Sequence, residues 1–379
     1  MLDLQDIRMK IDEVDLKLLE LFEYRMKLAV EVAEYKKSVN MPVYDAAREE
    51  EKIEAIKSMT INEFNKAATA DLFKQIMAVS RRLQYTMSDT FFKLGFTAAE
   101  NFSIDKDTRI VYYGEKGAYT EQAMLEYFVT CHEGIPMATF GEVMQAIKEG
   151  KSDYGVLPIE NSATGTLSDI FDLLAEYDNY IIGEHVMKID HNLWGLPGSS
   201  LSDINSVYSH RQGLMQCSSF LKSHGGMRQV ESGSTAGSAR RVLEEGDKSK
   251  AAIASRKAGE QFGLQLLQAS IQNDNTNSTR FIIITNRKAY IKGAGRTSIC
   301  FEAPHKTGSL YHILANFIYN NINMTRIESR PIHGKAFKYR FFVDIDGSLN
   351  EPSVNNALHC INEEALELKI LGCYKPIVS

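Results

Sequence analysis

Four cationic side chains recur within the first fifty residues, in a pattern that could hold a small dianion: Arg8, Arg25, Lys36 and Arg48. On a helix, the eleven-residue step from Arg25 to Lys36 keeps both within about 20° of one face and about 16 Å apart along the axis. Two long side chains could therefore reach one ligand between them. For a single residue, the alternative is that its charge simply extends from an apolar face to solvent. The formal net charge is −6, so an anionic substrate has to be held by local cations of this kind.

A helical seam positions these residues. Apolar and charged residues step by four and three along the first helix, at Leu4, Arg8, Ile11, Asp15, Leu18, Phe22, Arg25, Ala29, Val32 and Lys36. The pattern predicts a helix of more than thirty residues, about 50 Å long, and further helices over 45–58 and 62–94. A helix of that length cannot bury its seam within residues 1–95 alone, so we expect a homodimer or a higher homo-oligomer. Arg8 is about 25 Å from Arg25 on the same helix; a shared pocket requires it to come from another chain.

This region resembles the all-helical class of chorismate mutase over nearly its whole length. The matching residues are Arg8, Arg25, Lys36, Asp45, Arg48, Glu49, Ser80 and Gln84. The resemblance implies an intertwined dimer that folds chorismate into its reactive form and stabilises charge on the ether oxygen. It implies carboxylate contacts from Arg25 and a second chain's Arg8. It also places the catalytic Lys36 and Gln84 at the ether oxygen, with Glu49 at the ring hydroxyl and Arg48 and Asp45 assisting.

From Arg109 the pattern changes to short β-rich runs that alternate with helical ones, which is typical of an α/β layer fold. We expect strands at 110–114, 138–140 and 154–160, and linkers over 96–107 and 287–295. The predicted domain covers 108–286. A glycine-rich segment at 114–120 and a polar one at 234–239 each open a helix, where backbone N–H groups can bind an anion. Ordinary turns and helix N-caps explain the same residues.

Two further segments, 157–162 and 277–281, combine a strand with a polar cluster, and 209–212 reads Ser-His-Arg-Gln. Together with the two helix-opening segments they resemble prephenate dehydratase, although Arg211 stands where that family usually has proline. The resemblance implies two α/β lobes like those of periplasmic binding proteins, with the site in the cleft.

In this resemblance the reaction removes carbon dioxide and a ring hydroxyl, which leaves only when protonated. Thr279 would be the proton donor, with Glu160 a candidate for the relay and Arg280 a candidate partner for a substrate carboxylate. The expected positioning residues are Asn161, Ser162, His210, Ser234 and Thr235. A purely structural role for His210 is an equal alternative.

Residues 297–376 predict the order β-α-β-β-α-β of the split βαβ plan, an α+β ferredoxin-like unit. Two turn segments in it resemble the regulatory ACT domain. They comprise Gly308, Ser309 and Leu310, and Glu328, Ser329, Arg330 and Pro331. The resemblance implies that motifs from paired domains close around L-phenylalanine. The alternative is that glycine and proline simply form turns here.

The length, composition and cysteine spacing of the chain limit which class of protein it can be. The chain has 379 residues, 44% hydrophobic and 24% charged, which is ordinary for a soluble protein of two or three domains. The five cysteines show no metal-ligand spacing, and no apolar leader or membrane-length run occurs. We therefore expect a cytoplasmic protein with no metal, cofactor, nucleic-acid or membrane partner.

Together these patterns predict a multidomain enzyme that converts chorismate to prephenate and then prephenate to phenylpyruvate, with feedback inhibition by phenylalanine. Three alternatives stay open at this point. The cleft could belong to a ligand-binding module without catalysis, the second substrate could be arogenate, or one of the two enzymatic domains could be vestigial.

Overall fold

The computed structural model describes residues 3–87, 94–102, 104–130 and 133–377. The chain forms two compact units. The first comprises Met1–Leu94, Phe301–Met324 and Leu349–Leu368, and the second comprises Gly95–Cys300, Thr325–Ser348 and Lys369–Ser379.

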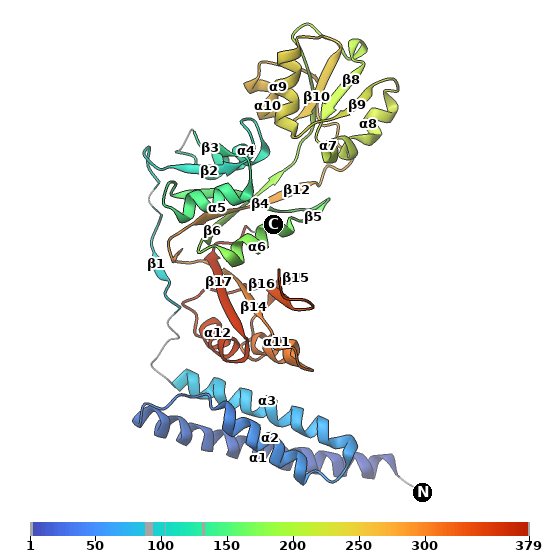
Figure 1. The fold of residues 1–379 in the computed structure, drawn as a ribbon. Coiled ribbons are helices and arrows are strands. Elements are labelled where there is room, and N and C mark those ends of the chain that lie inside the picture. Colours follow the sequence, from blue (N-terminus) through green and yellow to red (C-terminus); the bar gives the residue numbers. More distant parts are fainter. Residues whose placement is uncertain (1–2, 88–93, 103, 131–132, 378–379) are drawn as a thin grey trace. The chain divides into compact units, whose positions relative to one another are not determined.

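Three helices make up the N-terminal part of the first unit: α1 (Leu4–Ser38), α2 (Ala46–Met59) and α3 (Glu63–Met87) (Figure 1). The Asp3 side chain caps α1 and the Asp45 side chain caps α2, each by accepting a hydrogen bond from the first turn. The three predicted helices are therefore confirmed. Of the predicted third helix, 88–93 lie outside the described residues and Leu94 is not helical.

The long first helix leaves most of its apolar seam in solvent. Of its described residues, Ala29 and Ala33 are buried, whereas Leu18 and Leu21 are 56% and 65% exposed. Such an apolar stripe on one chain is what a protein–protein contact would cover.

Two helices from the C-terminal part of the chain complete this unit, α11 (Ser309–Tyr319) and α12 (Pro352–Glu364). They pack against each other, and α12 also contacts α3.

The second unit begins with a lobe built on a mixed sheet. Strands β2 (Ile110–Tyr113), β3 (Ile135–Met137) and β4 (Tyr154–Asn161) are parallel, and β12 (Ser278–Thr285) lies antiparallel between β4 and β6 (Tyr180–Lys188). The short β5 (Gly165–Thr166) pairs with the end of β4.

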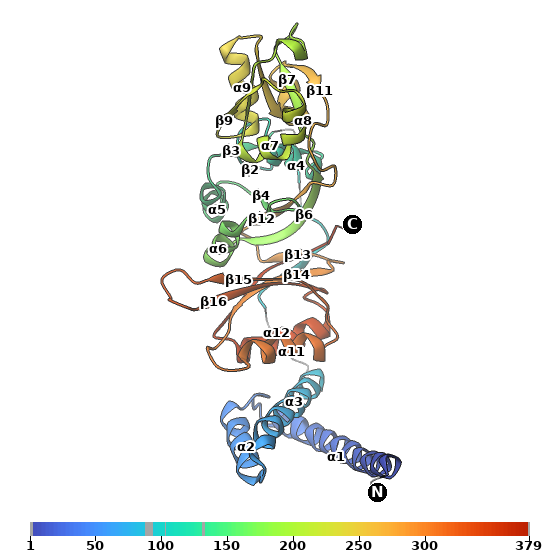
Figure 2. The same cartoon turned by 90° about the vertical axis from the view of Figure 1, so that its right-hand side faces the viewer.

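Helices cover both faces of this sheet. α4 (Tyr119–Tyr127) lies on one face, over a core that includes Tyr112 and Phe281. α5 (Phe140–Lys148) and α6 (Ser168–Glu176) lie on the other face (Figure 2). Alternate residues of each strand fill the two cores, as the two-residue period of a strand requires.

One strand of this lobe was misplaced by sequence reasoning. The strand expected at 138–140 lies three residues earlier, at β3, and 138–140 leads into α5. Thr139 is the N-cap, and Thr139 and Glu142 form a reciprocal capping box. Threonine followed three residues later by glutamate is a helix-start signal that outweighed the β propensity of Thr139 and Phe140.

The second lobe is inserted between β6 and β12. Its sheet has the order β11-β7-β10-β8-β9. The strands are β7 (Asn192–Gly195), β8 (Ser206–Ser209), β9 (Arg228–Glu231), β10 (Lys250–Ala254) and β11 (Gln265–Gln268). The helices are η1 (Leu201–Asp203), α7 (Arg211–Gln216), α8 (Ser218–Ser223), α9 (Thr235–Glu245) and α10 (Arg256–Gln261). The predicted pair of α/β lobes is thus present; its likeness to periplasmic binding proteins remains a prediction.

Four strands of the C-terminal region extend the first sheet: β14 (Arg296–Glu302), β15 (Met324–Pro331), β16 (Tyr339–Asp346) and β17 (Glu367–Tyr374). With α11 and α12 they follow the predicted order β-α-β-β-α-β. Their order in the sheet is β15-β16-β14-β17, and β17 runs parallel to β6, with Gly372 beside Ile181. One edge of the whole sheet is therefore β15, and the other is β3.

The two expected linkers are not structureless. β1 (Thr97–Ala99) and β13 (Ala289–Ile291), one from each linker, form a parallel pair. Pairing between distant segments leaves little trace in local sequence, which is why the local sequence indicates linkers at both places.

Candidate active sites

The helical region contains a cavity of about 150 Å³ at the residues predicted for the mutase site. All of the predicted residues except Arg8 line it: Arg25, Lys36, Asp45, Arg48, Glu49, Ser80 and Gln84. They come from all three helices and from the turn before α2. Side chains up to 59 positions apart in sequence are thus brought to one small cavity.

The two central cations of the cavity are held by neighbouring groups. The Arg25 guanidinium donates a hydrogen bond to the Ser80 hydroxyl, and the Lys36 ammonium donates to the carbonyl oxygen of Val43. Burial lowers the pKa of Arg25, and the nearby Glu49 carboxylate works against that shift. Held in this way, both groups present positive charge to the cavity, where an anionic ligand would be attracted.

The other members play different parts. Gln84 is 8% exposed, and its amide oxygen has no hydrogen-bond partner among the described residues. Asp45 accepts a hydrogen bond of 3.0 Å from the backbone N–H of Arg48, so part of its role is to begin α2. The Arg48 guanidinium donates to Glu51 at 2.7 Å and stays exposed.

Arg8 lies on the same helix as Arg25, exposed and away from the cavity. Whether a second chain supplies it is not tested by a single chain, so this stays a prediction.

Arg81 is a member of the site that sequence reasoning missed. It lines the cavity and forms an ion pair with Glu49. A signal was available, because Arg81 lies between Ser80 and Gln84 on α3. Its burial, however, depends on packing that local sequence does not reveal.

The residues predicted for the dehydratase site meet first at the ends of β4 and β12. Thr279 lies directly beside Asn161 in the antiparallel register. The Asn161 side-chain amide donates to the Thr279 hydroxyl at 2.9 Å and to the Asn277 side chain at 2.8 Å. Ser162 also belongs to this cluster, because its hydroxyl accepts a hydrogen bond of 2.9 Å from the backbone N–H of Ser278.

A cavity of about 270 Å³ lies beside this cluster, between the lobes. Asn277, which sequence reasoning did not single out, connects the cluster to it. The lining residues come from both lobes and from the returning chain: Ala163, Thr164, Gln212, Met215, Gln216, Gln272, Asn273, Asp274 and Asn277. Side-chain amides dominate this set, so the cavity offers both hydrogen-bond donors and acceptors.

The predicted residues of the second lobe stand at helix starts. His210 is the N-cap of α7 and accepts a hydrogen bond of 3.3 Å from the Gln212 N–H. Ser234 is the N-cap of α9 and accepts one of 2.8 Å from the Gly237 N–H. Thr235 is the first residue of α9. The capping alternative is therefore present for His210 and Ser234, which leaves a further role in binding open.

The glycine-rich segment of the first lobe reaches the same helix start. Ser234 donates a hydrogen bond of 2.9 Å to Glu115, which also pairs with Arg240 at 2.7 Å. In the same segment Gly117 has a φ of 86°, and a β-carbon there would lie 3.0 Å from the Ala258 backbone. The segment thus lies against the second lobe, and Gly117 allows the close approach.

Two further predicted residues, Glu160 and Arg280, lie on the opposite face of the sheet from Thr279. Arg280 is paired in the register with Glu160, as Thr279 is with Asn161. Because successive residues of a strand point to opposite faces, Glu160 and Arg280 face away from Thr279. The Arg280 guanidinium contacts Glu184 at 3.1 Å and Asp344 at 3.0 Å. The charge of Arg280 is thus matched by internal carboxylates. A proton relay through Glu160 and a substrate contact from Arg280 stay predictions.

The predicted phenylalanine-binding residues fall into two groups, one in each compact unit. Gly308 is the N-cap of α11, with a φ of 80°, and Ser309 and Leu310 form the first turn. Glu328, Ser329, Arg330 and Pro331 end β15. The Arg330 guanidinium binds both carboxylate oxygens of Asp172 on α6, at 3.3 and 2.5 Å.

Comparison with known proteins agrees with the two-site geometry. Residues 7–85 match the family model described as chorismate mutase type II, and residues 110–289 match prephenate dehydratase. A bifunctional chorismate mutase/prephenate dehydratase of Aquifex aeolicus is 33% identical over 377 residues, which is 98% of each chain. The chain belongs to the family of bifunctional chorismate mutase/prephenate dehydratases.

Two solved structures each cover 71% of this chain. The prephenate dehydratase of Arthrobacter aurescens, in complex with L-Phe, is 30% identical with a TM-score of 0.66, over 71% of this chain and 90% of that one. A structure described as a novel type of quorum quenching acylase, GqqA, is 31% identical with the same TM-score, over 71% of this chain and 98% of that one. These two structures share a fold but are described with different activities. Similarity to them therefore supports the fold of this chain more firmly than any one reaction.

Among the described residues, no helix is both long and apolar enough to cross a lipid bilayer. In the same part of the chain, no three His, Cys, Asp or Glu side chains are grouped as metal ligands would be.

Proposed function

We propose that this chain rearranges chorismate to prephenate in its helical domain and then dehydrates and decarboxylates prephenate to phenylpyruvate in its two-lobed domain. Inhibition by phenylalanine through residues 297–376 completes the proposal. The observation that supports it most strongly is the cavity lined by Arg25, Lys36, Glu49 and Gln84 in a chain similar over nearly its full length to bifunctional enzymes.

In the first reaction the protein has to hold a folded dianion and stabilise the charge that develops on the ether oxygen. Arg25 would bind one carboxylate of chorismate, and Lys36 and Gln84 would face the ether oxygen. Glu49 would accept a hydrogen bond from the ring hydroxyl, with Arg48, Asp45 and Ser80 supporting the site. No side chain has to gain or lose a proton, which fits a site that consists mainly of cations and amides.

In the second reaction Thr279 would donate a proton to the leaving hydroxyl and regain one from solvent through a relay, so that overall prephenate and a proton yield phenylpyruvate, carbon dioxide and water. The Asn161 amide donates to the Thr279 oxygen at 2.9 Å. That hydrogen bond occupies a lone pair of the oxygen, so the hydroxyl proton of Thr279 is directed elsewhere and is free to reach the substrate. Asn161, Ser162, His210, Ser234 and Thr235 would position prephenate between the lobes.

Phenylalanine would bind to an ACT domain formed by residues 297–376, between paired copies of the chain. Two observations support this. The segment Glu328–Pro331 ends an edge strand, which can pair with a second copy. The related Arthrobacter aurescens structure is a complex with L-Phe.

A glycine substitution tests the effector site. Gly308→Ala strains a backbone with a φ of 80°, and Gly334→Ala, with a φ of 76° and nothing within 4 Å, is its matched control. We expect Gly308→Ala to raise the phenylalanine concentration for half-inhibition of the dehydratase at least tenfold, and Gly334→Ala to leave it within about twofold. Equal inhibition curves would contradict this site.

The mutase site would be shared across a homodimer in the cytoplasm, with Arg8 supplied by the partner. Mixing Arg8→Ala and Lys36→Ala chains tests this. In the mixed dimer one site regains both native residues, so random mixing should restore about a quarter of wild-type mutase activity. If each site is built from one chain, mixing restores nothing.

The first experiment on the whole proposal is product analysis of the purified protein given chorismate, with and without phenylalanine. Phenylpyruvate formed from chorismate, and suppressed by phenylalanine, is the expected result. Binding without turnover would favour the ligand-binding alternative, and prephenate accumulation would confine activity to the helices. A comparison of the turnover rates on arogenate and on prephenate decides which of the two is the substrate of the second reaction.

A further inference from the structure

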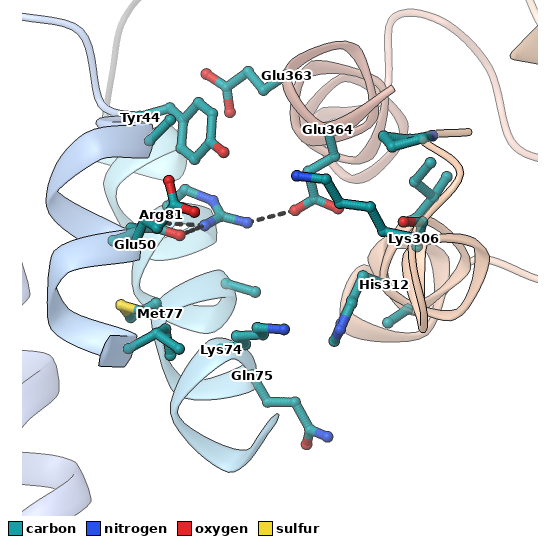
Figure 3. Close-up of a pocket in the computed structure, with 18 of the residues that line it drawn as sticks. Tyr44, Glu50, Lys74, Gln75, Met77, Arg81, Lys306, His312, Glu363 and Glu364 are labelled. Carbon is teal, nitrogen blue, oxygen red and sulfur yellow. Dashed lines mark hydrogen bonds and ion pairs between the residues drawn. The ribbon is translucent and has the colours of Figure 1, made fainter. Parts of the chain in front are cut away.

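Arg81 is among the most enclosed charges next to the mutase cavity. It lies on α3 between Ser80 and Gln84 and is 5% exposed. Its guanidinium points from α3 toward Glu364 on α12 (Figure 3), and Nη2 lies 2.6 Å from that carboxylate. Nη1 binds both carboxylate oxygens of Glu49, with Oε1 at 2.6 Å. One guanidinium thus joins a mutase-site carboxylate to a helix from the C-terminal region.

The surroundings keep this arrangement charged and fixed. Burial by itself would lower the pKa of Arg81, but Glu49 and Glu364 raise it above its usual value. The other oxygen of Glu364 accepts a hydrogen bond of 3.2 Å from Asn316 on α11. The ring of Tyr44 lies 5.0 Å from the guanidinium carbon, within the range of a cation–π contact.

The Glu49 side chain borders two cavities, and its carboxylate could point into either of them. Glu49 lines the mutase cavity of about 150 Å³ and also a second cavity of about 440 Å³ between α2, α3 and α11. Its side chain is 25% exposed, so packing alone does not fix its rotamer. The two bonds from Arg81 select one orientation, and the bond from Arg81 to Glu364 fixes the guanidinium in turn.

We propose that Arg81 is a positioning residue of the mutase reaction, which holds the Glu49 carboxylate in place with Glu364 as its second anchor. This inference rests on the proposed mutase activity. It adds to that activity a requirement for a residue of the C-terminal region, which lies 315 positions after Glu49 in the sequence. The competing explanation is that Arg81 only stabilises the packing of α3 against α12.

The test compares Arg81→Met and Arg81→Lys with the control Arg82→Met. Arg82 follows in the same helix and points about 100° away. We expect Arg81→Met to lower mutase kcat at least tenfold with a smaller change in KM, because misplacing a group near the substrate mainly affects the reacting geometry. Arg81→Lys should recover part of this loss, and Arg82→Met should stay within about twofold of wild type.

A double-mutant cycle separates positioning from packing. If Arg81 acts through Glu49, Arg81→Met should lower kcat by less than about threefold in a Glu49→Gln background. Glu364→Gln should show an intermediate loss. Turnover of added prephenate and the thermal midpoint, measured on every variant, report whether the chain is folded.

Two results would overturn the inference. The first is normal mutase kcat in folded Arg81→Met protein. The second is an equal loss with and without Glu49. A wild-type chain that does not consume chorismate would instead count against the proposed function, so the two failures are distinguishable.

Discussion

Arg280 and Asp344 form an ion pair of 3.0 Å that joins β12 of the dehydratase lobe to β16, a C-terminal strand of the same sheet. Both side chains are nearly buried, and Glu184 completes the cluster at 3.1 Å from the guanidinium. Ser298 donates a further hydrogen bond of 2.5 Å to Asp344. Because Arg280 follows Thr279 directly, the residue that ties β12 to β16 is covalently linked to the proposed proton donor.

Removing the Asp344 charge should therefore destabilise the second unit. Asp344→Asn leaves Arg280 with one fewer buried counter-charge, and we expect it to lower the free energy of unfolding by about 2–4 kcal/mol, as for other broken buried pairs. Urea unfolding measures this. Asp346→Asn, whose carboxylate is 45% exposed at 3.6 Å from Arg296, should cost less than about 1 kcal/mol. Equal stability of both variants and wild type would contradict the importance of the buried cluster.

Thr279→Ala should abolish dehydratase turnover and leave mutase turnover unchanged. The substitution removes the hydroxyl that Asn161 orients, so we expect a loss of at least a hundredfold in kcat on prephenate. Thr279→Ser keeps the hydroxyl and should retain measurable activity. Loss of both activities in Thr279→Ala would point to misfolding, and an active Thr279→Ala enzyme would rule out the proposed role.

Lys36→Ala should lower mutase turnover by orders of magnitude, because it removes the charge proposed to stabilise the ether oxygen. The control is Lys27→Ala, an exposed lysine nine residues earlier and half a turn around α1. Chorismate consumption measures both variants, and prephenate turnover checks that the chains fold. Near-normal turnover by Lys36→Ala would contradict the proposed role of Lys36 at the ether oxygen.

Gly372→Ala should disrupt the junction of β17 and β6. A β-carbon at Gly372 would lie 2.1 Å from the carbonyl oxygen of Ile181, and backbone cannot move aside as a flexible side chain can. We expect a loss of about 3 kcal/mol or more in the free energy of unfolding. Gly233→Ala, where nothing lies within 4 Å, should be nearly neutral. A Gly372→Ala protein that melts like wild type would contradict this close approach.

Glu363 should make the first unit less stable as the pH rises. Burial raises the pKa of Glu363 from 4.5 to about 7, despite opposing contributions from the Tyr85 hydroxyl and Arg81. The folded chain therefore keeps a proton that the unfolded chain releases above about pH 4.5, so stability falls between about pH 4.5 and 7. Glu363→Gln removes this contribution.

The measurement is urea unfolding at pH 5 and pH 8. His359, 3.7 Å from Glu363, and the nearby Glu364, Glu49 and Arg81 titrate or carry charge in both proteins, so the comparison is between wild type and variant. Glu363→Gln should gain stability relative to wild type at pH 8 but not at pH 5. Glu34→Gln, on the exposed face of α1, should show no such difference. Parallel pH dependence of wild type and Glu363→Gln would refute the prediction.

Local patterns in the sequence determined most of the elements. The step of three and four residues predicted α1 because helical side chains recur every 3.6 positions. The order of strands and helices after Arg296 was also predicted, since each element there has its own apolar period and its own turn residues. Around the mutase cavity, the spacing of Arg25 and Lys36 on one regular helix indicated two cations on a common face. The other predicted residues there were identified from the resemblance to the helical chorismate mutases.

The tertiary structure alone decided which way the polar residues of β12 point and what they meet. Thr279 and Arg280 are neighbours in sequence, yet one meets Asn161 and the other meets Asp344. Likewise, nothing local to Arg81 predicts that it bridges Glu49 and Glu364. Register and long-range packing set these contacts, since burying a charge is tolerated only where distant parts of the chain bring its counter-charges to it.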